Sequence, residues 1–249
     1  MLRPLPGGVT DPPPVELEVG FVGLDGRQVR MGLAEVVPVR FEAVAPVRAF
    51  PSFKRQRYFP GLWWSATTRR QVGYESWLER DHLMLLDHDP AVVGIASQPF
   101  WLFWQHDGKL RSHAPDYFAR RADGSAVVVD CQPLTRIKPR DAAAFETTRQ
   151  AGREVGWDYR PVCAPDPVLA ANVRWLAGYR HPRNAQPEVT AALREAFTVP
   201  GALMDGAQQV GDPIAILPVL FHLLWSQVLT VDLSRPLHDG SPVAVRAAR

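Results

Sequence analysis

The chain has 249 residues, of which 46% are hydrophobic and 22% are charged, and its formal net charge at pH 7 is +2. This composition is typical of a globular protein with enough apolar material for a sizeable core, arranged as one large domain or two modest ones. The overall charge gives no sign of nucleic-acid binding, so any such sign has to be local.

Cysteine content and hydropathy exclude several other classes of protein. Cys131 and Cys163 are too few for a disulfide framework or a cysteine zinc site, and we expect both to be buried thiols in a reducing compartment. The N-terminus lacks the apolar segment of a signal peptide, and the longest apolar run, 214–225, is interrupted by Pro218. These features predict a cytoplasmic protein with no membrane contact.

The first third of the chain is predicted to form a tail, a strand-rich arm and a loop. Residues 1–14 are rich in proline and glycine and are expected to be disordered. Short alternating runs between 15 and 47, with a turn at Leu24-Asp25-Gly26, predict a small β-hairpin. Residues 48–73 mix basic and aromatic side chains with proline and glycine, which favours a long ordered loop and completes an N-terminal unit over 15–73.

The basic and aromatic loop has two interpretations. Its aromatic rings pack on the core while its arginines stay solvated, or it contacts DNA, with cations at the phosphates and rings stacking on bases. In the second case the candidate DNA-binding residues in this loop are Lys54, Arg55, Arg57, Arg69 and Arg70.

An amphipathic helix is predicted to follow Ser76, a good N-cap residue. Glu79 occupies the capping-box position, where its carboxylate has the structural use of reaching back to the Ser76 N–H. The helix is expected to end at Asp89-Pro90. Its apolar face is predicted to contain Leu78, His82, Leu85 and Leu86.

A mixed sheet flanked by helices is predicted over the core unit, 74–180. The runs at 92–95 and 99–104 predict strands, and Ala122-Asp123-Gly124 predicts the turn of a hairpin whose second strand is 126–129. Further on, a helix over 138–155, a strand over 158–162 and a helix over 168–176 are expected. The fold class is therefore α/β.

Three acids in this unit form a candidate site for a divalent cation. The hairpin is expected to bring Asp116 near Asp130, and Glu79 lies on the preceding helix, with Glu75 as a rival to Glu79. Carboxylate oxygens suit Mg²⁺ or Mn²⁺, and such ions serve phosphoryl chemistry. Taken singly, each aspartate is an ordinary strand-end acid. His113 is either a half-exposed strand residue or a group that approaches a phosphate or a water molecule.

The last part of the chain, 187–249, is predicted to be a small winged-helix-like domain. Helical patterns at 187–197 and 213–225 are followed by two short strands around a turn at 238–240. The helix that would read DNA, HLLWSQV, carries no lysine or arginine, so a partner-binding or packing role is favoured.

The run SWLERDHLMLLDHDPAVVGIASQPF, followed by HAPDYF and VVVDCQP, resembles the TnsA-type endonuclease subunits of heteromeric transposases, within the restriction-endonuclease-like PD-(D/E)XK superfamily. The resemblance covers about 74–176. It places Glu79 on the helix carboxylate, Asp116 on the central metal-binding acid and Asp130 on a position that holds glutamine or an acid. Gln132 stands where the motif lysine belongs.

The resemblance implies an Mg²⁺-dependent DNA endonuclease that cuts the 5′ ends of a mobile element. Its partners would be double-stranded DNA, an integrase-type transposase and an ATPase regulator. In this family the lysine orients the attacking water and offsets charge, so its replacement by Gln132 predicts a rate lower by about 10²–10³. Lys138 and Arg136 are candidate substitutes for the catalytic lysine, with Lys138 favoured because it begins a helix, and Arg136 is also a candidate cation at the DNA. The alternative is a nuclease-fold adaptor that binds DNA and proteins with weak or no cleavage.

Overall fold

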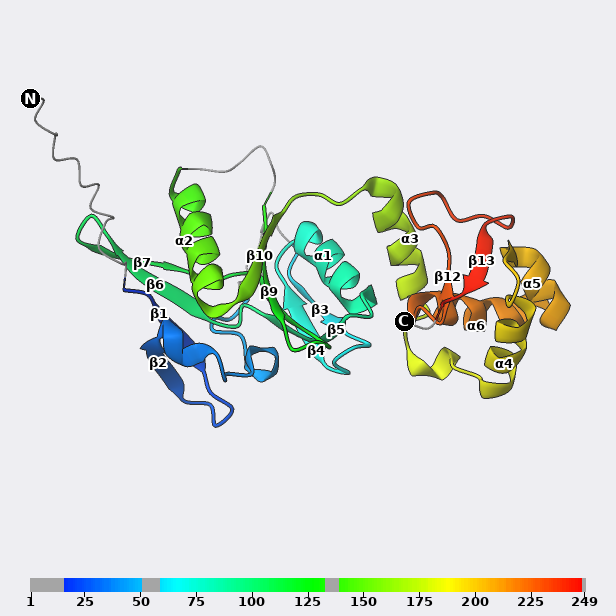
Figure 1. Cartoon of the computed structure of the whole chain (residues 1–249), viewed down its shortest axis with the longest axis horizontal. Helices are drawn as coiled ribbons and strands as arrows, with labels where there is room; N and C mark the ends of the chain where they lie inside the picture. Colours follow the sequence, from blue (N-terminus) through cyan, green and yellow to red (C-terminus); the bar gives the residue numbers. More distant parts are fainter. Residues whose placement is uncertain (1–15, 51–58, 133–138, 248–249) are drawn as a thin grey trace, which may run out of the picture.

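We describe the chain from a computed structural model, which covers residues 16–50, 59–132 and 139–247. Figure 1 shows an elongated molecule with a sheet-rich part at the N-terminal side and a helical part at the C-terminal side. The helix α3 (Pro167–Ala177) stands at the junction of the two parts. This mixed α/β architecture confirms the predicted fold class.

The central sheet has the strand order β10-β9-β8-β5. β9 pairs in parallel with β10, and the other two pairs are antiparallel. The helix α2 (Pro139–Val155) makes the crossover between the parallel strands. The strands span β5 (Val92–Ser97), β8 (Tyr117–Arg121), β9 (Ala126–Cys131) and β10 (Trp157–Val162). The predicted mixed sheet flanked by helices is therefore present.

Residues of β9 are buried on both sides of the sheet, as its unbroken apolar run predicts. Ala126 and Val128 pack in one core cluster with α2, while Val127 and Val129 pack in a second cluster with α1. The turn before β9 uses Gly124 at φ 85°, a conformation that costs glycine little.

The helix α1 (Trp77–His88) begins where the sequence predicts. The Ser76 side chain accepts a hydrogen bond from the Glu79 N–H, and the Glu79 carboxylate accepts one from Ser76 Oγ at 2.8 Å. The residues of the predicted apolar face are only half-buried. The most buried apolar residues of α1 are instead Leu83 and Met84. Leu83 faces the sheet and Met84 faces the C-terminal core, so two different surfaces cover the helix.

A second sheet, of order β2-β1-β6-β7, contains the predicted N-terminal hairpin. Its strands are β1 (Glu18–Val22), β2 (Gln28–Gly32), β6 (Trp101–His106) and β7 (Lys109–His113). The short 3-10 helices η1 (Leu33–Val36) and η2 (Phe41–Ala43) follow β2. The fully buried Phe41 ring joins the two sheets, with centroids 4.9 Å from Phe100 and 5.6 Å from Phe118.

The expected loop over 48–73 is corrected by the structure, because β3 (Gly61–Trp64) and β4 (Gln71–Tyr74) form an antiparallel hairpin. A buried carboxylate on α1 organises it. Asp87 accepts hydrogen bonds from Trp63 Nε1 and Ser65 Oγ, and from the backbone N–H groups of residues 66 and 67. The stabilising group lies some twenty residues further along the chain, so the local pattern gives no sign of the hairpin.

The C-terminal part is a helical cluster with a small sheet of order β11-β13-β12. Pro218 lies inside α6 without ending it, and α3 contributes Val173 and Leu176 to this core. The elements are η4 (Pro182–Asn184), α4 (Pro187–Ala196), β11 (Gly201–Ala202), α5 (Leu203–Val210), α6 (Pro213–Trp225), β12 (Leu229–Thr230) and β13 (Pro242–Val245).

Contacts along α1 join the two parts. His88 Nδ1 donates to the Trp225 carbonyl at 2.9 Å, and Arg174 on α3 forms an ion pair with Asp81. Within the described ranges, no helix is both long and apolar enough to cross a membrane. Both cysteines are free; Cys131 is buried as predicted, whereas Cys163 is only half-buried.

Candidate functional site

The three predicted acids come from three neighbouring elements. Glu79 lies in the first turn of α1, Asp116 immediately precedes β8, and Asp130 is near the end of β9. The last pair in the β8–β9 register joins Tyr117 to Val129. Asp116 and Asp130 therefore stand opposite one another one step beyond that pair, as the predicted hairpin requires.

Asp116 is the electrostatic centre of this group. Its Oδ2 accepts a hydrogen bond of 2.6 Å from the Cys131 N–H. Burial raises the pKa of the Asp116 carboxyl well above its usual value, and the charges of Asp130 and then Glu79 raise it further. Within the described residues, no arginine, lysine or histidine forms an ion pair with Asp116. Acidic groups are therefore concentrated here, and among the described residues no cation contacts Asp116.

Glu79 is held by its own helix terminus. One carboxylate oxygen accepts from Ser76 Oγ and the other accepts from the Glu75 N–H at 2.7 Å. The second donor differs from the predicted one, the Ser76 N–H. Burial raises the pKa of Glu79, and the charge of Glu75 adds to this effect. The rival ligand Glu75 is engaged in a bidentate pair with Arg48, with two distances of 2.9 Å.

Asp130 is enclosed on the side of the sheet that α2 covers. Its side chain is 2% exposed, and both carboxylate oxygens lie within 3.0 Å of His113 Nε2, which donates to them. The Tyr159 hydroxyl donates to Oδ2 at 2.7 Å. The histidine that the sequence singled out as half-exposed thus contacts Asp130. Tyr159 was missed, although its place on a strand parallel to β9 could have suggested it.

The donor chemistry of these acids fits a divalent cation, but their present arrangement does not complete a site. The charges of Asp130 and Glu79 raise the pKa of Asp116, and carboxylates are hard oxygen donors whose mutual repulsion a cation would relieve. Among the described residues, however, no three histidine, cysteine or acidic side chains are placed to hold one ion. Sharing an ion therefore requires at least one of the three carboxylates to change its side-chain conformation.

Of the remaining predicted site residues, Gln132, Arg69 and Arg70 lie within the described ranges. Gln132 is half-buried, and its N–H donates to the Val162 carbonyl at 2.8 Å, which extends the β9–β10 pairing by one residue. Arg69 is exposed in the β3–β4 turn, and Arg70 Nη2 donates to the Glu42 carbonyl. The other predicted cations lie outside the described residues: Lys54, Arg55, Arg57, Arg136 and Lys138.

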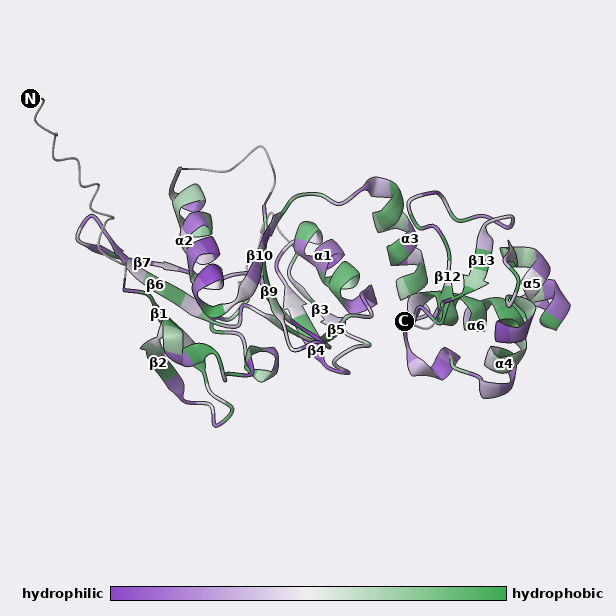
Figure 2. Ribbon diagram, viewed as in Figure 1, coloured by the Kyte–Doolittle hydropathy of each residue, from purple (hydrophilic) through white to green (hydrophobic). Residues whose placement is uncertain are grey.

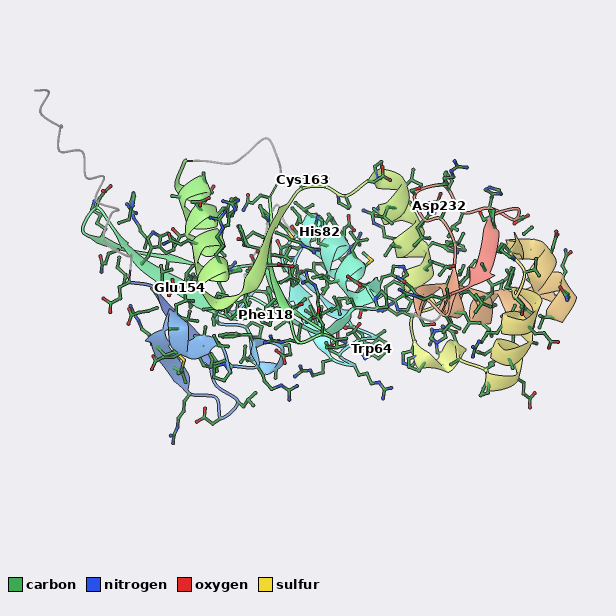
Figure 3. The ribbon with its side chains drawn as sticks, viewed as in Figure 1. Trp64, His82, Phe118, Glu154, Cys163 and Asp232 are labelled. Carbon is green, nitrogen blue, oxygen red and sulfur yellow. The ribbon has the colours of Figure 1, made fainter. Side chains whose placement is uncertain are left out.

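Two further histidines have structural roles. His82 Nε2 lies 2.6 Å from the Cys163 carbonyl, to which it donates, and Figure 3 shows both residues where α1 passes the segment after β10. Burial lowers the pKa of both His82 and His88, so both rings are neutral near pH 7. Each one fastens α1 to a carbonyl of a distant segment.

Comparison with protein-family models gives no match, and comparison with curated protein sequences gives none either. The features that indicate a function are therefore the geometry of this chain and the motif pattern in its sequence.

Proposed function

We propose that this chain is the Mg²⁺-dependent DNA endonuclease subunit of a TnsA-like heteromeric transposase. The observation that supports this most is the position of Asp116, a carboxyl whose pKa is strongly raised by burial and by two other acids, Asp130 on the adjacent strand β9 and Glu79 on α1. Carboxylates concentrated in this way, with no cation of the described ranges in contact with the central one, are typical of sites that hold a metal ion.

The order of elements supports a restriction-endonuclease-like core. The helix α1 precedes three strands, β5, β8 and β9, and α2 then crosses over to β10 in parallel with β9. Between β5 and β8 the β6–β7 hairpin leaves this sheet to join the N-terminal one. The candidate carboxylates then lie on the helix and on the two adjacent strands that the superfamily uses for its metal site.

In this proposal Asp116 and Glu79 hold the ion, with Asp130 as third acid. A bound Mg²⁺ would polarise the scissile phosphate and lower the pKa of an attacking water. The Cys131 N–H fixes Oδ2 of Asp116, and Oδ1, which accepts no hydrogen bond from the described residues, would ligate the ion. His113 and Tyr159 orient the Asp130 carboxylate. Gln132 is a hydrogen-bonding amide without charge, so the protein's own contribution to transition-state stabilisation is small unless Lys138 supplies it.

The C-terminal part supports a docking role beside the nuclease core. Its helices end in the small β12–β13 pair, as a winged-helix-like unit requires, and α6 is predominantly apolar. We therefore propose that this part contacts an integrase-type transposase, which cuts the 3′ ends of the element, and an ATPase regulator.

The test is nicking of supercoiled plasmid with Mg²⁺ or Mn²⁺, with and without the neighbouring transposase subunit. The double variant Asp116→Ala/Asp130→Ala should lose all metal-dependent nicking. The matched control is Asp123→Ala/Asp232→Ala, which removes two exposed carboxylates from turns and should nick normally. Circular dichroism confirms that each variant is folded. If the first variant nicks as fast as the native protein, the site is wrong.

A second candidate function is a non-catalytic adaptor with a nuclease fold. It is favoured by the full hydrogen bonding of Asp130 and by the uncharged Gln132. In this case the native protein binds DNA without cutting it, and Gln132→Lys creates or raises activity. Efficient nicking by the native protein that Lys138→Ala abolishes would exclude the adaptor.

A further inference from the structure

The β6–β7 hairpin carries a row of basic side chains on one face. The register pairs Leu102 with His113, Trp104 with Arg111 and His106 with Lys109, and cross-strand partners share a face. The row therefore runs along β7 as Lys109, Arg111 and His113, with His106 beside it. Lys109 and Arg111 are exposed, and within the described ranges neither forms an ion pair.

This row ends at the candidate site. His113, its inner member, donates to Asp130, while its outer members continue toward the hairpin tip. Figure 1 shows the hairpin extending away from the central sheet beside α2, and Figure 2 shows its tip coloured as hydrophilic. A molecule that lies along the row therefore arrives at the acids from one side.

A cleft of about 640 Å³ lies along the same face. Its walls come from β6, β7 and the first turns of α2, and they include Trp104, His106, Arg111, His113, Asp141 and Ala144. Two acids lie near the basic side chains of this face. Asp141 lines the cleft, and Asp107 Oδ2 lies 3.5 Å from His106 Nε2. β7 itself carries two permanent cations, Lys109 and Arg111, and no acid.

The spacing of the row suits a nucleic-acid backbone. Alternate residues of an antiparallel strand are about 6.8 Å apart, so the row from Lys109 to His113 spans about 14 Å. A duplex strand carries one phosphate for about each 3.4 Å of axis, so this length covers about four base pairs. β7 is also the outermost strand of its sheet, so backbone N–H groups on its open edge are available to phosphate oxygens.

We propose that the β6–β7 hairpin is the DNA-backbone contact of this protein, and that Lys109 and Arg111 bind phosphates of the strand whose path leads to Asp116 and Asp130. The proposal rests on the proposed function in that DNA is the ligand. It moves the main DNA contact from the basic loop over 48–73 to β7. Charged residues on an edge strand also prevent edge-to-edge pairing, and the experiment separates the two roles.

The experiment measures binding of a fluorescent 30-base-pair duplex to the full chain by anisotropy, in EDTA and at fixed pH. Lys109→Ala/Arg111→Ala should weaken binding about tenfold for two unrelated sequences, because phosphate contacts are independent of sequence. The slope of log K against log salt should become shallower by about 1.8, for two lost contacts. The control Arg27→Ala/Arg235→Ala removes two cations of 86% and 84% side-chain exposure elsewhere and should bind as the native protein does.

The proposal would be overturned if Lys109→Ala/Arg111→Ala had the same affinity and the same salt slope as Arg27→Ala/Arg235→Ala, whether both bind as the native protein does or both bind more weakly. Size-exclusion chromatography of Lys109→Ala/Arg111→Ala covers the edge-strand alternative. If this variant aggregates while its monomer fraction keeps native affinity, the row protects an edge and does not bind DNA. Because binding is measured without metal, absence of nicking by the native protein would count against the nuclease proposal alone.

Discussion

Replacement of Asp116 by asparagine is the sharpest test of the acidic centre. The Asp116→Asn side chain would keep an oxygen to accept the Cys131 N–H and would lose the charge that Asp130 and Glu79 repel. One unit of pKa shift corresponds to about 1.4 kcal/mol. Because the pKa of Asp116 is raised well above its usual value, we expect Asp116→Asn to increase the free energy of unfolding at pH 7, by about 1.4 kcal/mol for each unit by which the folded pKa exceeds the unfolded one.

The pH dependence follows from the sign of the shift. Above the unfolded pKa of about 3.9, the native Asp116 carboxyl retains a proton that the unfolded chain has lost. The contribution of Asp116 to stability therefore declines as pH rises from about 3.9 through the raised folded pKa. Asp116→Asn removes this decline, so the difference in stability between the two proteins should be smallest below about pH 4 and should grow as pH increases.

Urea denaturation followed by tryptophan fluorescence, at intervals from about pH 4 to about pH 8, measures this difference. The control Asp123→Asn should show the opposite sign, since hydrogen bonds from Ser125 lower the pKa of Asp123. Added Mg²⁺ should stabilise the native protein and leave Asp116→Asn unchanged. A variant that is less stable than the native protein at pH 7, or a difference that does not vary with pH, would refute the electrostatic argument.

Two further predictions concern contacts that hold α1 in place. Asp87→Ala should lower the free energy of unfolding by about 3 kcal/mol in urea denaturation, because it leaves buried donors of the β3–β4 turn without an acceptor; a loss below about 1 kcal/mol would contradict this role. Burial lowers the folded pKa of His88, so its contribution to stability is present above the unfolded pKa of about 6.5 and is lost as pH falls below it. The difference in stability between the native protein and His88→Gln, measured by urea denaturation, should therefore become smaller as pH is lowered from about 7.5 to about 5.5; the contributions of His82 and Asp116 are present in both proteins and cancel.

Several elements could be predicted because their causes are local. The cap of α1 at Ser76 requires only residues within the next turn, and the β8–β9 turn requires only Gly124 and its neighbours. The end of α2 coincides with Gly156 at φ 75°, a conformation that glycine adopts readily. In each case the deciding interaction lies within a few positions of the residue that predicts it.

Other features depend on residues that are distant in sequence. The β3–β4 hairpin requires Asp87 from α1, so its own composition suggested a loop. The buried face of α1 is divided between Leu83 and Met84, because the sheet and the C-terminal core approach from different sides. A pattern search for one apolar face does not represent that geometry.

For the candidate site, the amino-acid sequence by itself determined which acids stand at the ends of adjacent elements, because strand and turn signals establish the β8–β9 pairing. Only the tertiary structure decided where each carboxylate points. Asp130 meets His113 and Tyr159, which come from strands of two different sheets, and Glu79 stays on its helix terminus. A side chain takes the partners that packing brings to it, and those partners depend on the arrangement of sheets that no local segment specifies.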